Sequence, residues 1–341
     1  MKPIVCSAAL LALLSAPTLF GQYSTATRPA CGKFATVQFN DGFYSCERWA
    51  VFPWYAAGQS WQSQISMFVA PLATGGNGQP RGAGVDIGPG PNGTNRFLSG
   101  GAFGSYALIQ GDDFEVVASS SSVRLDIVDS AACLTPSTCF LDGGLALGPL
   151  WISIDAPDVQ TLEATQIQLI YLYRDANGVL SRQVAVPPVF QDQATAKWVS
   201  SFSETPVNVA AGVNANFMAF AVTNLSKQPQ AVSVQFYDQN GILVAEKNTP
   251  ILAAGQGGDQ FFADSQYAGQ VIPGGVYAAN VKDFFAFTST QFSGITAATL
   301  AKTGTIDGTI MFRGLNGGAI APLVVRTVGA SLTLLLQTPL P

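Results

Sequence analysis

The sequence predicts an all-β protein made of many short antiparallel strands. Charged residues make up only 11% of the 341-residue chain, hydrophobic residues make up 48%, and there are 35 glycines and 20 prolines. Helical domains usually carry charged, solvated faces, whereas strands joined by tight turns are rich in β-branched residues, glycine and proline. The stretch from Ala210 to Ala254 follows this pattern closely, and we expect it to form three consecutive strands.

Two segments combine alternating apolar residues with an Asp-x-Asn-Gly turn. The turns are Asp175 to Gly178 and Asp238 to Gly241, and each follows a run in which every second residue is apolar. This period is typical of a strand with one buried face, and Asn and Gly accept the positive φ that short hairpins require. Each segment therefore predicts a β-hairpin. Both lack the later bidentate glutamate of a calcium loop, which favours the turn over a calcium site.

The repeated hairpin belongs to a wider internal similarity that predicts two related modules in tandem. Ala56-Ala57-Gly58 and Ala210-Ala211-Gly212 each precede a predicted strand, and Asp113-Phe114 resembles Asp283-Phe284 in the same order. The glycine-rich segment Thr74–Gly101 is predicted to be a long loop inserted in the first module. The predicted boundaries are 48–195 for the first module, 196–331 for the second, and 332–341 for a C-terminal strand or tail.

The N-terminus has the features of a cleaved secretory signal peptide over residues 1–21. Lys2 supplies an early positive charge, Ala8 to Leu14 forms a short apolar core, and small residues follow. Such a run is too short to span a membrane as a helix. We therefore expect a mature chain that has no transmembrane segment and is secreted or otherwise extracytoplasmic, in a periplasm or at a cell surface.

Four cysteines remain after the predicted signal peptide, and an even number in an exported chain favours disulfides. The short sequence separations favour Cys31 with Cys46 and Cys133 with Cys139, while other pairings stay open. Residues 22–47 would then be an N-terminal segment tied by a disulfide. A four-thiolate zinc site is the alternative, but the chain has no Cys-x-x-Cys pair to favour it.

The absence of histidine excludes several classes of catalytic and metal site. Ser-His-Asp and Cys-His catalysis and histidine-ligated metals all need imidazole. Carboxylate pairs could still serve a glycosidase, which places two acids across a sugar, and the candidates are Asp112, Asp113 and Glu115, or Asp126 and Asp129. Asp112 and Asp113 also keep a calcium site open, and the sequence predicts no other cofactor.

Aromatic residues crowd one short stretch, in which Trp49, Phe52, Trp54, Tyr55 and Trp61 lie close together. Rings exposed on a β-sandwich can stack on the apolar faces of sugars, which would make this stretch a carbohydrate-binding platform. The alternative, which we favour, is that the rings fill the core or the seam between the modules.

The second half of the chain carries a family resemblance in the order of its motifs. It contains a VSVQFYDQNG hairpin, a PILAAGQ turn, an FTSTQFSG strand and the segment IMFRGLNGGAIAPLVV. This order resembles the exported tandem Ig-like β-sandwich modules of uncharacterised secreted proteins of soil bacteria, over Val209 to Arg326 and more loosely over Arg48 to Phe190. The resemblance implies an Ig-like sandwich and an extracytoplasmic location, and it supplies no catalytic residues.

These features together predict a non-catalytic secreted or cell-surface protein with a structural or adhesive role, rather than an enzyme. Its partner would be a polysaccharide or another surface protein. Nucleic acid is excluded as a partner because the net charge is −5 and no Lys/Arg cluster is present. The alternatives are a carbohydrate-binding protein that uses the aromatic stretch and a carboxylate-dependent glycosidase.

Overall fold

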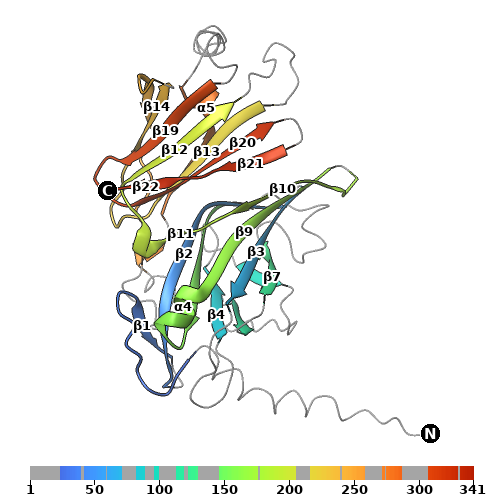
Figure 1. The fold of residues 1–341 in the computed structure, drawn as a ribbon, viewed down its shortest axis with the longest axis vertical. Coiled ribbons are helices and arrows are strands. Elements are labelled where there is room, and N and C mark those ends of the chain that lie inside the picture. Colours follow the sequence, from blue (N-terminus) through green and yellow to red (C-terminus); the bar gives the residue numbers. More distant parts are fainter. Residues whose placement is uncertain are drawn as a thin grey trace, which may run out of the picture.

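The computed structural model confirms the all-β prediction (Figure 1). Antiparallel strands dominate the described residues, and the helices among them are two short α-helices and one 3-10 turn. The residues that the structure describes are 24–39, 42–58, 60–70, 82–88, 96–99, 113–118, 122–129, 146–175, 177–204, 216–238, 240–257, 271–272, 274–285, 306–328 and 331–341.

The strands that precede residue 191 form two antiparallel sheets. One has the order β1-β2-β8-β4-β6, with β11 also paired to β2, and the other has the order β10-β9-β3-β7-β5. A short helix, α4 (Val159–Ala164), connects β8 to β9 and is capped by the carboxylate of Asp158. The strands of these sheets are β1 (Ala35–Gln38), β2 (Tyr44–Ala57), β3 (Trp61–Val69), β4 (Gly82–Ile87), β5 (Arg96–Ser99), β6 (Asp113–Ala118), β7 (Ser122–Asp129), β8 (Ala146–Ala156), β9 (Thr165–Arg174), β10 (Leu180–Val186) and β11 (Val189–Phe190).

The strands that follow residue 196 form a second pair of sheets, which Figure 1 shows above the first pair. Their orders are β15-β14-β19-β12-β22 and β18-β13-β20-β21, and β16 pairs with β17 separately. The 3-10 turn η2 (Gln191–Gln193) links the two pairs, and helix α5 (Val281–Phe285) follows β18. The strands are β12 (Lys197–Glu204), β13 (Asn216–Asn224), β14 (Val232–Asp238), β15 (Leu243–Asn248), β16 (Gln256–Gly257), β17 (Val271–Ile272), β18 (Val276–Asn280), β19 (Ile306–Gly314), β20 (Ile320–Val328), β21 (Ser331–Leu335) and β22 (Thr338–Leu340).

Each pair of sheets encloses an apolar core and therefore packs as a sandwich. In the first sandwich, Val85 and Ile152 of one sheet share a core with Ile65 of the other. In the second sandwich, Phe312 of β19 packs against Phe220 of β13, with ring centroids 5.5 Å apart. Burying a side chain of this size contributes about 1.5–3 kcal/mol, so these alternating residues are the main source of stability.

The central strand β13 is buried on both faces. Phe220 and Val222 belong to the core of the second sandwich, whereas Ala221 between them belongs to the core of the first. Leu323 on the neighbouring strand β20 also packs in the first core. The sheet β18-β13-β20-β21 thus lies between two apolar layers and joins the sandwiches.

We call the contact between this sheet and the first sandwich the joint. The first sandwich also contributes side chains to it. Trp49 and Val51 of β2 and Trp151 of β8 belong to the core of the second sandwich. The hydroxyl of Thr223 on β13 donates a hydrogen bond of 3.0 Å to the backbone carbonyl of Pro53 on β2. Apolar packing and a buried hydrogen bond therefore hold the two sandwiches together.

Both predicted hairpins are confirmed, as β9–β10 and β14–β15. One carboxylate oxygen of Asp175 accepts from the backbone N–H groups of Asn177 and Val179, each at 2.9 Å. Asp238 accepts in the same way from the N–H groups two and four residues later, at 2.8 and 2.9 Å. The glycines that close the turns have φ of 76° and 75°. Local turn chemistry is therefore repeated in detail in the two sandwiches.

We expect Gly241→Ala to lower the free energy of unfolding by about 1–2 kcal/mol, because a Cβ in the left-handed region meets its own backbone. Nothing else lies within 4 Å of such a Cβ, so the strain would be purely conformational. Urea unfolding measures the loss, and Gly241→Asn is the matched control because asparagine tolerates this region. Equal losses for the two variants would contradict this explanation.

The predicted glycine-rich loop Thr74–Gly101 is wrong in part, because β4 and β5 lie within it. Ala83, Val85 and Ile87 are fully buried in the first core. These residues alternate with glycine and aspartate, so the segment has the period of a strand despite its glycine content. Glycine content outweighed periodicity in the prediction, and periodicity is the stronger signal here.

The internal match between Asp113-Phe114 and Asp283-Phe284 is also wrong as a structural repeat. The first dipeptide begins strand β6, whereas the second lies in helix α5. Residues 210–212 of the other match fall outside the described residues. The C-terminal segment 332–341 does form strands, with β21 paired to β20 and β22 paired to β12, so it completes both sheets of the second sandwich. The described part of the chain includes no helix with the length and apolarity that a membrane crossing needs.

Candidate functional site

A pocket of about 200 Å³ opens beside β2, near the linker between the two sandwiches. On this edge of β2, β1 pairs as far as Glu47 and β11 pairs from Ala50. The backbone between these two pairings leaves room for side chains from neighbouring segments. The pocket is lined by Lys33, Phe34, Ala35, Glu47, Arg48, Trp49, Gln191 and Asp192.

A disulfide positions the N-terminal side of this pocket. Cys31 and Cys46 are bonded, with their Cα atoms 5.3 Å apart, which confirms the pairing that the spacing predicts. Both are buried, and Cys46 lies in β2 two residues before Arg48. The cross-link therefore holds Lys33 beside the strand that carries Arg48. Cys133 and Cys139 lie in a part of the chain that the structure does not describe.

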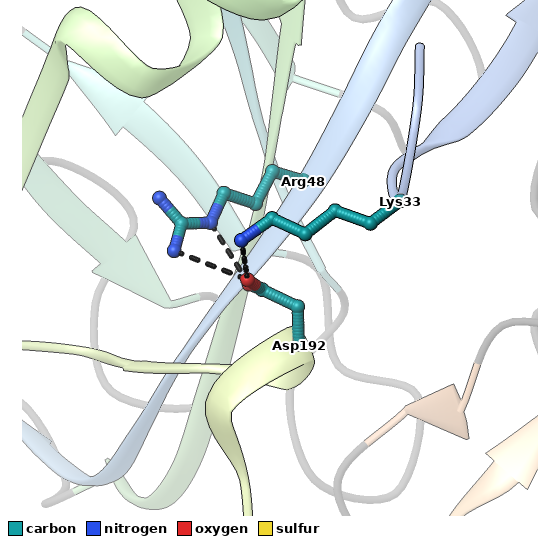
Figure 2. Close-up of polar contacts among 3 residues, drawn as sticks. All are labelled: Lys33, Arg48 and Asp192. Atoms are coloured by element: carbon teal, nitrogen blue, oxygen red, sulfur yellow. Dashed lines mark hydrogen bonds and ion pairs between the residues drawn. The ribbon is translucent and has the colours of Figure 1, made fainter.

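Three charged side chains that line the pocket meet one another, and Figure 2 shows their contacts. Asp192 projects from the turn η2 and accepts a 2.9 Å hydrogen bond from Nε of Arg48. A second guanidinium nitrogen of Arg48 lies 3.4 Å from the other carboxylate oxygen, and Nζ of Lys33 lies 3.1 Å from that same oxygen. One carboxylate thus ties together the N-terminal segment, β2 and the linker to the second sandwich.

Aromatic rings hold Arg48 in this position. Its guanidinium carbon lies 3.5 Å from the ring centroid of Phe190 and 5.5 Å from that of Phe34. Its side chain is 10% exposed, whereas that of Lys33 is 59% exposed. Arg48 is therefore a structural residue, held in place by a favourable cation–π contact. Lys33, in contrast, is accessible to solvent.

The charges around the pocket are balanced. Burial alone would raise the pKa of Asp192. The hydrogen bonds and positive charges of Arg48 and Lys33 outweigh this effect, so the pKa of Asp192 lies below its ordinary value. The lining also includes the acidic residue Glu47, giving two basic and two acidic side chains. Such a lining favours a neutral or zwitterionic polar group over a strongly charged one, and it contains no nucleophile placed beside a base.

The predicted aromatic platform is wrong for Trp49 and Tyr55, which are buried. They belong to different cores, so they lie on opposite faces of β2. Trp54 and Trp61 are half-buried and pack against the first core. Trp49 stacks on Trp151, with ring centroids 4.2 Å apart, at the joint between the sandwiches. Its position matches the favoured alternative, in which the rings fill a core or a seam.

The predicted acidic sites are only partly described. Asp112 falls outside the described residues, and Asp113 is the first residue of β6. Asp126 accepts hydrogen bonds from the amides of Gln62 and Gln64 on the neighbouring strand β3. Within the described ranges no group of three or more potential metal-ligating side chains gathers.

A buried acid pair escaped the sequence analysis. Glu47 of β2 and Asp155 of β8 are direct register partners and are both buried. Burial raises the pKa of Asp155 to about 7, against the hydrogen bond that Ser45 donates to it. The signal in the sequence is an acidic residue at an otherwise apolar position of each strand, but only the strand register brings these two together.

Comparison with known proteins found no match to this chain among family models, curated proteins or solved structures.

Proposed function

We propose that the protein is a non-catalytic, exported structural or adhesive component with two tandem Ig-like β-sandwiches, at 48–195 and 196–331. The observation that carries this proposal is the joint, in which strand β13 contributes to both cores. Sandwiches linked only by a flexible tether would move independently, whereas an apolar interface holds them at one orientation. A rigid pair of sandwiches suits a protein that presents contact points at a set spacing.

Two features support export of the protein, namely the predicted signal peptide and the Cys31–Cys46 disulfide. The predicted signal peptide precedes a disulfide whose two cysteines are both buried. Disulfides of this structural kind form and persist in oxidising compartments outside the cytosol. The chain also lacks the histidine on which many hydrolytic sites depend, which supports a role in binding rather than catalysis.

The two matching hairpin tips are the contact points that we infer. Val179 and Leu180 at the first tip are 60% and 45% exposed, and Ile242 and Leu243 at the second are 61% and 45% exposed. Equivalent positions thus display a β-branched aliphatic residue followed by leucine, to nearly the same extent. Aliphatic pairs offer apolar surface but neither a flat ring nor a hydrogen-bonding group for a sugar, so they fit an apolar patch on a protein partner.

Binding of the purified mature chain to intact producing cells, followed by flow cytometry, tests this function. Replacing all four tip residues with serine should reduce binding at least tenfold, because the apolar contacts are lost. The matched control is Ile251→Ser with Leu336→Ser, since these side chains are 75% and 72% exposed but lie away from the tips. Protease treatment of the cells should abolish binding, whereas soluble polysaccharide should not compete. Undiminished binding by the tip variant, or competition by polysaccharide, would contradict the proposal.

A further inference from the structure

Two acidic side chains are buried opposite each other in the sheet of the first sandwich that contributes Trp49 and Trp151 to the joint. Glu47 and Asp155 are 2% and 3% exposed and are register partners on the antiparallel strands β2 and β8. Partners of this kind point to the same face, with Cβ atoms about 5 Å apart. The hydroxyl of Ser45 donates to one carboxylate oxygen of Asp155 at 3.0 Å. Two buried carboxyls on register partners disfavour double ionisation, because each negative charge opposes the other.

Glu47 also lines the pocket that contains Lys33, Arg48 and Asp192, and the neighbouring strands supply the other groups around the pair. On β1, the residues registered with Glu47 and Ser45 are Ala35 and Val37. On β4, the register partner of Asp155 is Gly84, and Asp86 is the partner of Ser153. Helix α4 contributes Leu162 to the core on the opposite face of the sheet, and its Glu163 is exposed. Glu47 is therefore the direct register partner of Asp155, and Asp86 is the acidic residue registered one pair further along on β4.

The acid pair lies on the same face of the sheet as the tryptophans of the joint. Side chains alternate along a strand, so Glu47 shares a face with Trp49, and Asp155 shares that face with Ser153 and Trp151. Trp49 and Trp151 stack on each other within the core of the second sandwich. Ionisation of the acid pair therefore places a negative charge at the edge of the joint, where it favours entry of water.

We propose that Glu47 and Asp155 form a proton-binding pair that makes the joint between the sandwiches more stable in mildly acidic surroundings than at neutral pH. This device is independent of the partner that the hairpin tips bind. The chain has no histidine, so no imidazole titrates in the same range and obscures the response.

The direction of the pH dependence follows from where the proton is held. Asp155 has a pKa of about 7 in the folded protein and an ordinary value of 3.8 when solvated. Between these values the folded chain holds a proton that the unfolded chain has lost. The contribution of Asp155 to the free energy of unfolding is therefore fully present below the unfolded pKa. It falls as pH rises toward and through the folded pKa, and it stays level above that value. From pH 5 to pH 8, the folding equilibrium constant should fall about a hundredfold.

Urea unfolding of the mature chain at intervals from pH 5 to pH 8.5 tests the proposal. The folding equilibrium constant of the wild type should fall by the predicted hundredfold between pH 5 and pH 8. Asp155→Asn keeps an acceptor for Ser45 but cannot ionise, so its folding equilibrium constant should change little with pH. Glu246→Gln is the control, because Glu246 is an exposed carboxylate of β15 and its removal should leave the wild-type profile unchanged. A flat wild-type profile, or an unchanged slope in Asp155→Asn, would overturn the proposal.

Native tryptophan fluorescence over the same pH range supplies a second readout. Ionisation beside Trp49 and Trp151 should change the emission with a midpoint near the pKa of about 7. Glu47→Gln should move that midpoint to lower pH, because the like charge beside Asp155 is removed. This variant keeps the proposal testable if Asp155→Asn does not fold. An emission midpoint that Glu47→Gln leaves in place would also overturn it.

Discussion

Trp151→Ala should lower the free energy of unfolding by about 3–5 kcal/mol, which is the usual cost of truncating a fully buried large side chain. Trp151 is 1% exposed, and its ring stacks on Trp49 within the core of the second sandwich. The substitution would leave a cavity at the joint, where both sandwiches contribute packing. Urea unfolding monitored by circular dichroism measures the loss, because the signal then does not depend on the tryptophan that is removed.

Trp61→Ala is the matched control, because Trp61 is only half-buried and contacts Tyr173 at the edge of the first sandwich. Its loss should be clearly smaller. Gly88→Ala should disturb the same ring, since a Cβ on Gly88 would lie 1.9 Å from the indole of Trp151 and would displace it. We expect it to reproduce part of the Trp151→Ala effect. A loss below about 1 kcal/mol for Trp151→Ala would show that the joint does not depend on this stack.

Removing the Cys31–Cys46 disulfide should destabilise the protein by about 3 kcal/mol, which chain-entropy estimates give for a closed loop of about 15 residues. The two cysteines are separated by 15 positions. The same change frees the segment that carries Lys33, so its ion pair with Asp192 should weaken as well. The measurement is the denaturation midpoint of Cys31→Ser with Cys46→Ser against the oxidised parent.

Both chains in this comparison should carry serine at Cys133 and Cys139, so that the effect belongs to one disulfide alone. Lys33→Ala separates the ion pair from the cross-link, and it should cost at most about 1 kcal/mol because the lysine is largely exposed. A reductant should lower the midpoint of the parent to that of the double variant. A parent that unfolds identically with and without reductant would contradict a stabilising role for this bond.

The hairpins and the N-terminal disulfide show what sequence reasoning predicts well. Asp175 and Asp238 form their turns with backbone groups only two and four residues away. The Cys31–Cys46 loop is similarly short. Such interactions depend on neighbours along the chain, so spacing and residue type are enough to identify them.

The glycine-rich segment and the acid pair show where that reasoning fails. Val85 and its alternating neighbours have the period of a strand, but glycine between them makes the segment look like a loop. Glu47 and Asp155 become a pair only through the register of β2 and β8, which no local pattern specifies. The aromatic stretch fails for a related reason, since a register shift in β2 between Phe52 and Tyr55 changes which face each ring occupies.

By itself, the sequence determined that this protein is all-β, with two hairpins of the same design and a disulfide at Cys31 and Cys46. These features follow from composition, from a period of two, and from contacts between residues close in the chain. Only the tertiary structure decided that β13 is shared by two cores, that Trp49 lies in a joint, and that Glu47 faces Asp155. The physical reason is that strand pairing and sheet packing join residues far apart in the chain, and burial then changes what their side chains can do.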